Sequence, residues 1–356
     1  MRVLVTGGCG YIGSHVALAL VDAGYDPVLL DNFSNSSPQV ADRLSAIAGR
    51  PLITVHCDVR DSAGVRLAML SNDVAAVIHC AARKAVAESV ACPLLYDSSN
   101  VGGMLSLLDA MDAVRVRSIV FSSSATVYGQ PQRLPLREDH PTRATNPYGQ
   151  TKLICENILS DLARSASSWR VSLLRYFNPI GAHPSGLIGD DPEGLPNNIM
   201  PIITRVANGK LPRLDVYGTD FPTDDGTAVR DYVHVLDLAE GHVAALEALG
   251  GGDPLQIYNL GTGRGTSVKQ LITTFERVNR VAVPWVAADR RAGDEPTLYA
   301  AVTKARCELG WSATRSLEQM CVDSWRFAAS PQRRPFMIGG ERPVAVKAAA
   351  NAIALF

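Results

Sequence analysis

The sequence predicts an α/β fold in which a parallel, Rossmann-like sheet carries helices on both faces. Two observations predict it. Short apolar runs rich in Val, Ile and Leu alternate with longer amphipathic stretches, and the first run leads directly into a cluster of glycines. Strands that alternate with helices form right-handed crossovers and therefore a parallel sheet. Because the runs are apolar almost throughout, we expect both faces of the sheet to be covered.

The expected elements follow from the length and periodicity of these segments. Strands are expected near residues 2–6, 27–31, 52–58, 76–81, 118–123 and 171–178, and helices near 12–23, 61–71, 94–113 and 148–164. Beyond Asn178, the segment 179–197 is dense in Gly, Pro and Asp and has no period, which is typical of a binding loop. Further helices are expected near 198–208, 235–249 and 267–277, with a strand at 256–260.

This organisation indicates three regions. We expect a first domain over residues 1–178, to which later segments such as 230–262 return, then a smaller mixed α/β lobe over 179–331 and a tail over 332–356. Residues 336–356 are rich in alanine and are expected to form a frayed end or a docked terminal helix. Ligands of parallel sheets bind beyond the carboxyl ends of the strands, so we expect the functional site there.

The composition narrows the class of protein. The chain has 356 residues, of which 47% are hydrophobic and 19% charged, as in globular proteins with a large core. The net charge of −1 argues against nucleic acid as a partner, and no segment is apolar and long enough to cross a membrane. Seven scattered cysteines show neither a Cys-x-x-Cys pair nor a metal-binding spacing. Since the first strand leaves no room for a signal peptide, we expect a cytoplasmic protein with reduced thiols and no bound metal.

The glycine cluster predicts a dinucleotide site. Gly7, Gly10 and Gly13 fall between the first strand and the first helix. Glycines there permit a tight turn, a close approach of backbone to a pyrophosphate and close packing of helix on strand, while the helix N-terminus attracts the anion. Asp31 ends the second strand, where a carboxylate accepts hydrogen bonds from a ribose and repels a 2′-phosphate, which favours NAD over NADP. The alternative for Asp31 is a turn cap. Asp58, after the third strand, either holds the adenine amino group or caps a strand-end turn.

Tyr148 and Lys152 form the candidate chemical centre. Their spacing places both side chains on one face of a helix. A lysine ammonium beside a phenol favours the phenolate, so the pKa of Tyr148 is expected to fall and the side chain to act as a general base toward an alcohol. The alternative is a solvated helix face. Ser124 follows the strand near 118–123 and either relays a proton to Tyr148 or satisfies loop backbone.

Several segments together carry a family resemblance from Met1 to about Pro331. They are residues 5–15, 121–129, 146–152, 174–179, 181–185, 196–201 and 229–234. With them the chain resembles the extended short-chain dehydrogenase/reductases, and among these the UDP-glucose 4-epimerase family. The resemblance implies tightly held NAD and a UDP-sugar substrate. Tyr148 would take the proton of the sugar 4-hydroxyl while C4 gives up a hydride, and the 4-keto sugar would turn over before the hydride returns to its other face.

The resemblance also implies roles for individual residues. Lys152 would tune Tyr148 and bind the nicotinamide ribose, Lys84 would lie near the cofactor phosphates and Phe177 near the nicotinamide. The implied cofactor contacts are Gly7, Gly10, Tyr11, Ile12, Gly13, Asp31, Asn32, Asn35, Ser36, Asp58, Val59, Cys80, Ala81, Ala82, Lys84, Ser99, Tyr148, Lys152 and Phe177. Cys80, Ala82 and Ser99 differ from the residues usual in the family. The implied substrate contacts are Ser124, Asn178, Asn198, Ile199, Asp215, Val216, Tyr217, Arg230, Tyr232, Arg291, Asp294 and Leu298.

Physical chemistry supports some of these substrate contacts. Arg230 and Arg291 can pair with a diphosphate as forked, charge-assisted donors, although Arg230 beside Asp231 is also typical of a surface ion pair. Asn198 precedes a helix with Pro201 in its first turn, which is typical of an anion-binding end. The resemblance further implies that Leu298 stands beside the hexose, where a bulky residue excludes N-acetyl sugars. Because Leu is intermediate in size, the size of the accepted sugar stays open.

Alternatives to interconversion of UDP-glucose and UDP-galactose remain. The closest is C4 epimerisation of UDP-N-acetylglucosamine or UDP-glucuronate. A nucleotide-sugar dehydratase is disfavoured because Ala125 and Thr126 stand where it needs an acid and a base. A non-catalytic NAD-binding sensor is expected to lack the Tyr or the Lys. By resemblance, we expect a homodimer formed through the helices near 94–113 and 148–164.

Overall fold

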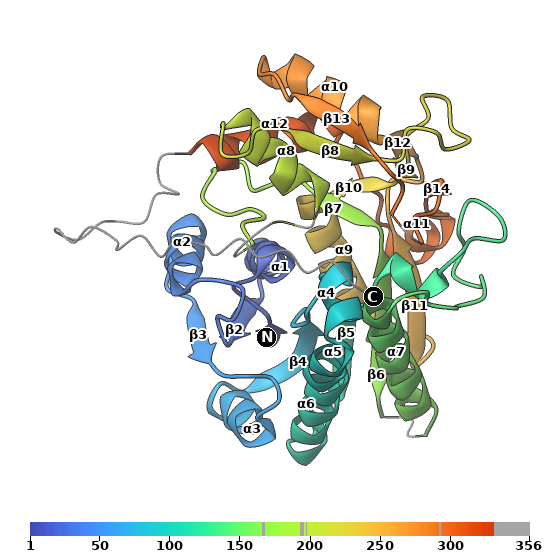
Figure 1. Ribbon diagram of the computed structural model, residues 1–356. Helices are drawn as coiled ribbons and strands as arrows, with labels where there is room; N and C mark the ends of the chain where they lie inside the picture. Colours follow the sequence, from blue (N-terminus) through green and yellow to red (C-terminus); the bar gives the residue numbers. More distant parts are fainter. Residues whose placement is uncertain (166–167, 193–195, 197, 292, 331–356) are drawn as a thin grey trace.

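A computed structural model of the chain describes residues 1–165, 168–192, 196, 198–291 and 293–330. Over these residues the centre is a seven-stranded, entirely parallel sheet in the order β11-β6-β5-β4-β1-β2-β3 (Figure 1). The strands are β1 (Arg2–Thr6), β2 (Asp26–Asp31), β3 (Ile53–His56), β4 (Val74–His79), β5 (Ser118–Ser122), β6 (Arg170–Tyr176) and β11 (Leu255–Leu260). The predicted Rossmann-like fold is therefore confirmed.

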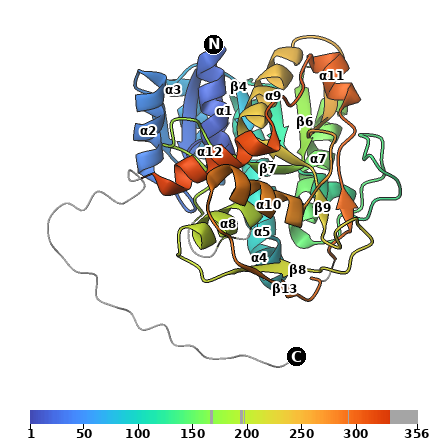
Figure 2. The same ribbon diagram turned by 90° about the horizontal axis from the view of Figure 1, so that it is seen from above.

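Helices cover both faces of this sheet (Figures 1 and 2). One face packs against α3 (Ser62–Ser71), α6 (Gly102–Ala113) and α7 (Pro147–Ser165), and the other against α1 (Tyr11–Asp22) and α9 (Val235–Ala248). Because successive strand residues point to opposite sides, Leu4 joins the first core while Val3 and Val5 join the second. An additional helix, α2 (Pro38–Ala48), begins with the Ser37 side chain as its N-cap and contacts α1. Residues 31–35, which follow β2, thus lead into a helix that the sequence did not predict.

The helix expected near 94–113 is present, with one irregularity inside it. The chain is helical from Pro93 to Ala113, as α5 (Pro93–Tyr96), a π-helical turn η1 (Asp97–Val101) and α6, and the short helix α4 (Val86–Ala91) precedes it. Asn100 lies buried in this turn, where its side chain binds the backbone N–H and C=O of Arg83 and donates to the Thr151 hydroxyl at 2.9 Å. The wider π turn thereby links the loop after β4 to α7, and such turns occur frequently at functional sites.

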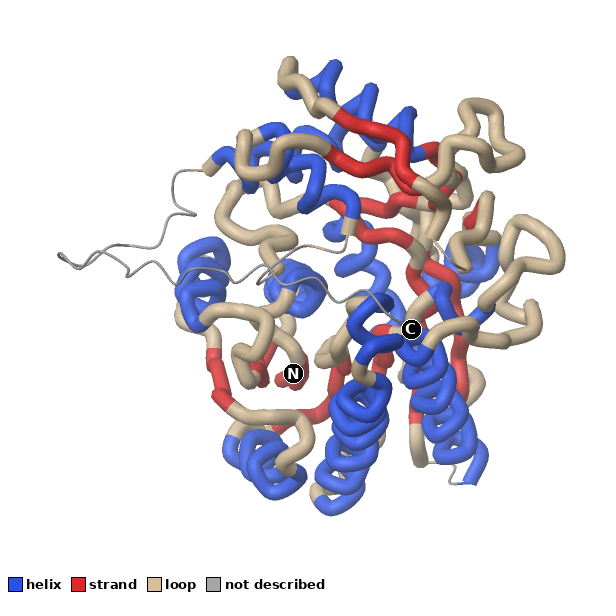
Figure 3. The backbone as a smooth tube through the Cα atoms, viewed as in Figure 1, coloured by secondary structure: helices blue, strands red, loops and turns tan. Residues whose placement is uncertain are grey.

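A smaller lobe lies above the carboxyl end of the sheet in Figure 1. Its strands are short and pair in small groups, as the red segments at the top of Figure 3 show. They are β7 (Asn178–Ile180), β8 (Leu214–Tyr217), β9 (Val229–Arg230), β10 (Tyr232–His234), β12 (Thr266–Ser267), β13 (Trp285–Ala288) and β14 (Thr297–Leu298). Its core is formed with the helices α8 (Ile199–Ala207), α10 (Val268–Asn279) and α12 (Leu317–Ala329). The last helix before α12 is α11 (Thr303–Leu309).

The two parts of the fold share one chain path. After the first strands of the small lobe, α9 packs on α1, and β11 extends the sheet beside β6. Residues 230–262 therefore contribute strands to the small lobe and a helix and a strand to the part with the large sheet. None of the described helices is long and apolar enough to cross a membrane. The expected frayed or docked end at 336–356 lies outside the described residues.

A buried ion pair fixes α7 to the sheet. Arg175 on β6 donates to the Glu156 carboxylate of α7 through Nη2 at 2.6 Å and through Nε at 3.0 Å, and their side chains are 6% and 3% exposed. The Ser123 hydroxyl donates to the same carboxylate, and Arg175 also donates to the Glu138 carbonyl. These contacts set the position of the helix that carries Tyr148 and Lys152.

Candidate active site

The glycine loop after β1 is shaped for close contact with a ligand. Gly7 has a φ of +66°, and a Cβ on it would lie 2.9 Å from the backbone of Ala81, while a Cβ on Gly13 would lie 2.1 Å from the Gly7 carbonyl oxygen. Glycine is therefore required at both positions. The N-cap of α1 is Gly10, which offers no side-chain cap. The first N–H groups of α1, from Tyr11, Ile12 and Gly13, thus remain available to an anion, and this cradle fits a dinucleotide pyrophosphate.

Asp31 is buried at the end of β2 and is held by the glycine loop. Its carboxylate accepts from the Cys9 N–H at 2.9 Å, the Phe33 N–H at 2.8 Å and the Ser36 hydroxyl at 2.9 Å. The side chain is therefore a loop cap, as one alternative predicted. A carboxylate has about four acceptor sites, so capping still leaves capacity for a ribose hydroxyl.

The residues around Asp58 form a second polar group at this edge. Asp58 accepts a forked pair from Arg60 at 2.9 and 2.8 Å and a third bond from Asn32 at 2.8 Å. The Arg60 hydrogen bonds are the main cause of the lowered pKa of Asp58. The turn-cap interpretation of Asp58 therefore describes this structure. Val59 beside it is buried, and Asn35 is exposed before α2.

The loop after β4 carries the next predicted contacts. Cys80 is partly buried, and its thiol lies 3.2 Å from the Ser122 hydroxyl. Ala81 is fixed by a bond from its N–H to the Thr6 hydroxyl at 3.3 Å, and Ala82 is exposed. Ser99 lies across from this loop in η1 and is half-buried. Phe177 is buried in a cluster with Val127, Tyr128, Leu136 and Ala300.

Tyr148 and Lys152 face the sheet rather than solvent. Both belong to the buried side of α7, with Tyr148 7% and Lys152 3% exposed, so the solvated-face alternative is wrong. The Tyr148 N–H donates to the Ser89 hydroxyl at 3.2 Å. The Lys152 ammonium donates to the Ser122 carbonyl at 2.7 Å and lies 4.7 Å from the centre of the Phe121 ring. The ammonium is thus anchored at the carboxyl end of β5.

The expected fall in the pKa of Tyr148 is wrong for the protein alone. Burial raises the pKa of this phenol to about 12, and only a hydrogen-bonding interaction with Ser124 opposes the rise. Burial also lowers the pKa of Lys152 to about 8. A phenolate is a charged form, and desolvation disfavours it. The chain itself therefore supplies a protonated, buried phenol, and a positive charge from the bound ligand is needed to favour its deprotonation.

Ser124 satisfies loop backbone, as one alternative predicted, and it also lies beside Tyr148. Its hydroxyl accepts from the N–H and the hydroxyl of Thr126, at 3.2 and 2.9 Å, and so caps the turn η2 (Ala125–Tyr128). The same hydroxyl interacts with Tyr148. A loop cap thereby holds the oxygen beside the candidate base.

A polar chain that the sequence did not predict lies behind Lys152. The Ser122 hydroxyl lies 2.7 Å from Nε2 of His242, whose Nδ1 lies 2.8 Å from the Leu238 carbonyl oxygen. His242 is fully buried, and burial lowers its pKa to about 4. Ser122 and His242 come from distant segments, and no local motif points to their contact.

We expect Lys152→Met to stabilise the cofactor-free protein at pH 7. On folding, the pKa of Lys152 falls from 10.5 to about 8. At pH values where this lysine is protonated in both the folded and the unfolded chain, the shift lowers the free energy of unfolding by roughly 3 kcal/mol. The unfolded chain binds more protons between pH 8 and 10.5, so native stability rises there and the advantage of the variant fades. Thermal unfolding from pH 7 to 10 measures this.

Lys304→Met is the matched control for that experiment. Lys304 also donates to a strand carbonyl, that of Ile257 at 2.9 Å, and lies 5.0 Å from the Tyr258 ring centre, but its side chain is 36% exposed. Its removal should change stability little at any of these pH values. An unchanged or lower stability of Lys152→Met at pH 7 would contradict the argument from burial.

The substrate side of the site begins at α8. Asn198 is the N-cap residue of this helix but makes no capping bond, and its Nδ2 donates instead to Asp190 Oδ2 at 3.1 Å. The helix N-terminus beginning at Ile199 is thus left for another acceptor. Asn178 is exposed at the start of β7, next to the buried Phe177. Asp190 carried no signal in the sequence beyond its place in a Gly- and Pro-rich loop.

Arg230 and Arg291 converge on one carboxylate. Arg291 Nε donates to Asp294 at 3.1 Å, and Arg230 Nη2 lies 4.0 Å from the same side chain. Arg230 donates to the Glu295 carbonyl and is 16% exposed. Asp231 turns away into the fold and accepts from the Thr262, Gly263 and Ala300 N–H groups, so the surface-pair alternative is wrong.

The remaining predicted substrate residues divide by burial. In β8, Asp215 and Tyr217 are exposed while Val216 points into the core, and the Arg291 guanidinium lies 4.7 Å from the Tyr217 ring centre. Tyr232 is buried, which raises its pKa to about 12. Leu298 pairs with Arg230 across β14 and β9 and packs against the cluster that contains Phe177. Leu298 thus links the guanidinium side of the site to the Phe177 side.

The chain is similar in sequence to known proteins over most of its length. The UDP-glucose 4-epimerase of Bacillus subtilis is 54% identical over 330 residues, 93% of this chain and 97% of that protein. The mouse UDP-glucose 4-epimerase is 48% identical over 333 residues, 92% and 96% of the two chains.

Solved structures with the same fold are also found. The UDP-glucose-4-epimerase from Stenotrophomonas maltophila, with bound NAD and formylated UDP-arabinopyranose, superposes with a TM-score of 0.90 at 46% identity, over 92% of this chain and 98% of the other. The enzyme from Bifidobacterium longum in complex with NAD+ and UDP gives 0.89 at 45% identity with the same coverage. The sequence profile of one family matches residues 3–261. The chain therefore belongs to the NAD dependent epimerase/dehydratase family.

Proposed function

We propose that the chain is a UDP-glucose 4-epimerase, which interconverts UDP-glucose and UDP-galactose with NAD as its cofactor. The observation that carries the proposal is the burial of Tyr148 and Lys152 on one side of α7 at the carboxyl end of β5, beside Ser124. The glycine cradle supports the cofactor, and the relatives described above support the reaction.

In this mechanism the chain positions the sugar and moves one proton. NAD, when bound, supplies the acceptor and later the donor of the C4 hydride. Tyr148 removes the proton of the 4-hydroxyl and returns it, and Ser124 holds the hydroxyl in line with the phenol. Lys152, anchored on the Ser122 carbonyl, provides a fixed positive charge and a donor for the nicotinamide ribose. Arg230 and Arg291 bind the diphosphate, for which they would exchange their contacts with Asp294.

An assay without added cofactor tests the function. The protein as purified should convert UDP-glucose to UDP-galactose to equilibrium, because the cofactor is regenerated in each cycle. Binding of NAD without turnover of any nucleotide sugar would support the non-catalytic sensor instead. A dehydratase remains disfavoured because Ala125 and Thr126, which begin η2, carry no carboxylate.

Leu298 is proposed to limit the size of the sugar. We expect Leu298→Ala to raise the kcat/KM for UDP-N-acetylglucosamine relative to UDP-glucose by about tenfold, as a few methylene groups of pocket space allow. Leu134→Ala is the control, because Leu134 is a partly buried member of the same cluster without a proposed sugar contact. An unchanged preference in Leu298→Ala would remove Leu298 as the determinant.

We further propose a homodimer in a reducing, cytoplasmic environment. All seven cysteines are free thiols, as expected in a reducing environment.

The proposed dimer interface is formed by exposed apolar side chains. Among the described residues, Val90, Leu94 and Leu105 on α4, α5 and α6 are 63%, 82% and 53% exposed, beside α7. Such exposed apolar groups are typical of an interface. Leu94→Asp should halve the mass measured by analytical ultracentrifugation, whereas Leu70→Asp, at a 58% exposed leucine of α3, should not. A dimeric Leu94→Asp variant would place the interface elsewhere.

A further inference from the structure

Asp190 lies where the cofactor side and the substrate side of the site meet. Its Oδ1 is 3.5 Å from the Lys84 ammonium, and its Oδ2 accepts from Asn198 Nδ2 at 3.1 Å. The carboxylate side chain is only 11% exposed, whereas the Lys84 side chain is 40% exposed. One largely enclosed carboxylate thus contacts one residue that is implied to bind the cofactor and one that is implied to bind the substrate.

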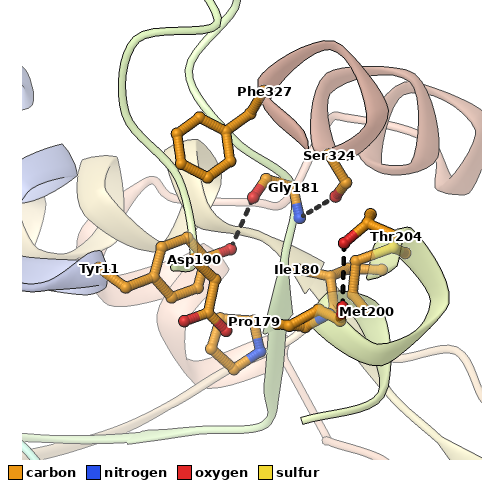
Figure 4. A pocket seen from close by; sticks show the side chains of 10 residues that line it. Tyr11, Pro179, Ile180, Gly181, Asp190, Met200, Thr204, Ser324 and Phe327 are labelled. Atoms are coloured by element: carbon orange, nitrogen blue, oxygen red, sulfur yellow. Dashed lines mark hydrogen bonds between the residues drawn. The ribbon is translucent and has the colours of Figure 1, made fainter. Parts of the chain in front are cut away.

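The surroundings of Asp190 are built from both parts of the fold (Figure 4). Tyr11, the first residue of α1, donates its hydroxyl to the Gly181 carbonyl at 2.8 Å, and Gly181 N–H donates to Ser324 of α12 at 3.1 Å. The Lys84 ammonium lies 5.7 Å from the Tyr11 ring centre. Burial, with a smaller contribution from the Asp190 charge, raises the pKa of Tyr11. The glycine loop and the small lobe therefore meet around this carboxylate.

We propose that Asp190 is a positioning residue that couples the binding of NAD to the binding of the UDP diphosphate. It orients Lys84 toward the cofactor and Asn198, at the N-terminus of α8, toward the substrate. A ligand that fixes either partner also fixes the carboxylate, and the other partner then binds at a smaller loss of side-chain freedom. The inference rests on the proposed roles of Lys84 and Asn198.

A competing electrostatic effect has the opposite sign. A carboxylate near two phosphate groups repels both, so its neutralisation would tighten their binding if repulsion dominated. We expect positioning to dominate because the long, 40% exposed Lys84 side chain pairs with this carboxylate at 3.5 Å, while its contact with the Tyr11 ring, at 5.7 Å from the ring centre, is looser. The two effects predict opposite changes in the rate of NAD release.

The experiment measures NAD release from the holoenzyme with and without saturating UDP. In the native protein UDP should slow the release. Asp190→Asn retains an acceptor for Asn198 but no charge for Lys84, so NAD should leave about fivefold faster, and the effect of UDP on that rate should disappear. By reciprocity, UDP should bind the holoenzyme of this variant more weakly, by the factor through which UDP tightens NAD binding in the native protein. Asp190→Glu should restore the coupling, which a loss of fold would not allow. Asp26→Asn is the charge-matched control, because Asp26 pairs with Arg50 at the far end of β2.

The outcomes separate the inference from the roles on which it rests. If Lys84→Met accelerates NAD release and Asn198→Ala weakens UDP binding, both roles stand. Slower NAD release from Asp190→Asn, or an undiminished effect of UDP in that variant, would then overturn the coupling. Unchanged NAD release from Lys84→Met would instead overturn the role of Lys84, and epimerisation by the native protein is measured independently of both.

Discussion

Tyr148→Phe is expected to lose kcat by about 10²–10⁴-fold while NAD stays bound, because the substitution removes only the group that exchanges a proton with the sugar. The ring of Tyr148 is buried on α7, and Phe fills the same space. The KM for UDP-glucose should change little. Turnover of UDP-glucose and the bound NAD, measured on the same preparation, separate the loss of the proton acceptor from a loss of cofactor.

Tyr128→Phe provides the control for the loss of a buried phenol. Its hydroxyl donates to Asn259 at 2.7 Å, and the residue ends η2, close to Ser124 but without a role in proton transfer. This variant should keep kcat within a fewfold of the native value. Near-normal turnover by Tyr148→Phe would reject Tyr148 as the base.

Arg175→Met is expected to destabilise the fold by about 3–5 kcal/mol at pH 7, the usual consequence of leaving a buried charge without its partner. Glu156 would keep the Ser123 hydroxyl as a donor but lose its forked contact with the guanidinium. Chemical denaturation monitored by circular dichroism measures the loss. Because α7 carries Tyr148, activity should fall at temperatures well below those that inactivate the native protein.

Two further variants test the origin of that loss. Arg277→Met breaks a pair with Glu318 whose side chains are 61% and 51% exposed, and it should cost less than about 1 kcal/mol. Replacing Glu156 by Leu together with Arg175→Met removes both charges and should recover much of the stability. If the double variant is as unstable as Arg175→Met, packing rather than the unpaired carboxylate explains the result.

Local patterns in the sequence were sufficient for most of the framework. Each strand of the sheet was recognisable because it is a short apolar run. Successive side chains of a strand alternate between the two faces, so Val3 packs in the core on one face of the sheet and Leu4 in the core on the other. Gly7 and Gly13 were recognisable because a side chain at either position would collide with backbone. The spacing of Tyr148 and Lys152 was sufficient to put them on one helix face.

Other features depend on contacts between distant segments. The π-helical turn within the helix near 94–113 was not predicted, because Asn100 binds Arg83 and Thr151, and no local periodicity encodes these contacts. The rise in the pKa of Tyr148 in the protein alone was not predicted for a similar reason. The spacing to Lys152 is local, but the ammonium is held by Ser122, and burial of Tyr148 by the surrounding fold dominates.

The sequence by itself thus determined the strands of the sheet, the glycine cradle and the face of α7 that carries Tyr148 and Lys152, since each is encoded in residues a few positions apart. The tertiary structure alone decided the anchor of Lys152, the convergence of Arg230 and Arg291 on Asp294, and the place of Asp190 between Lys84 and Asn198. Desolvation and charge pairing depend on which distant segments come into contact, and these contacts form only when the whole chain folds.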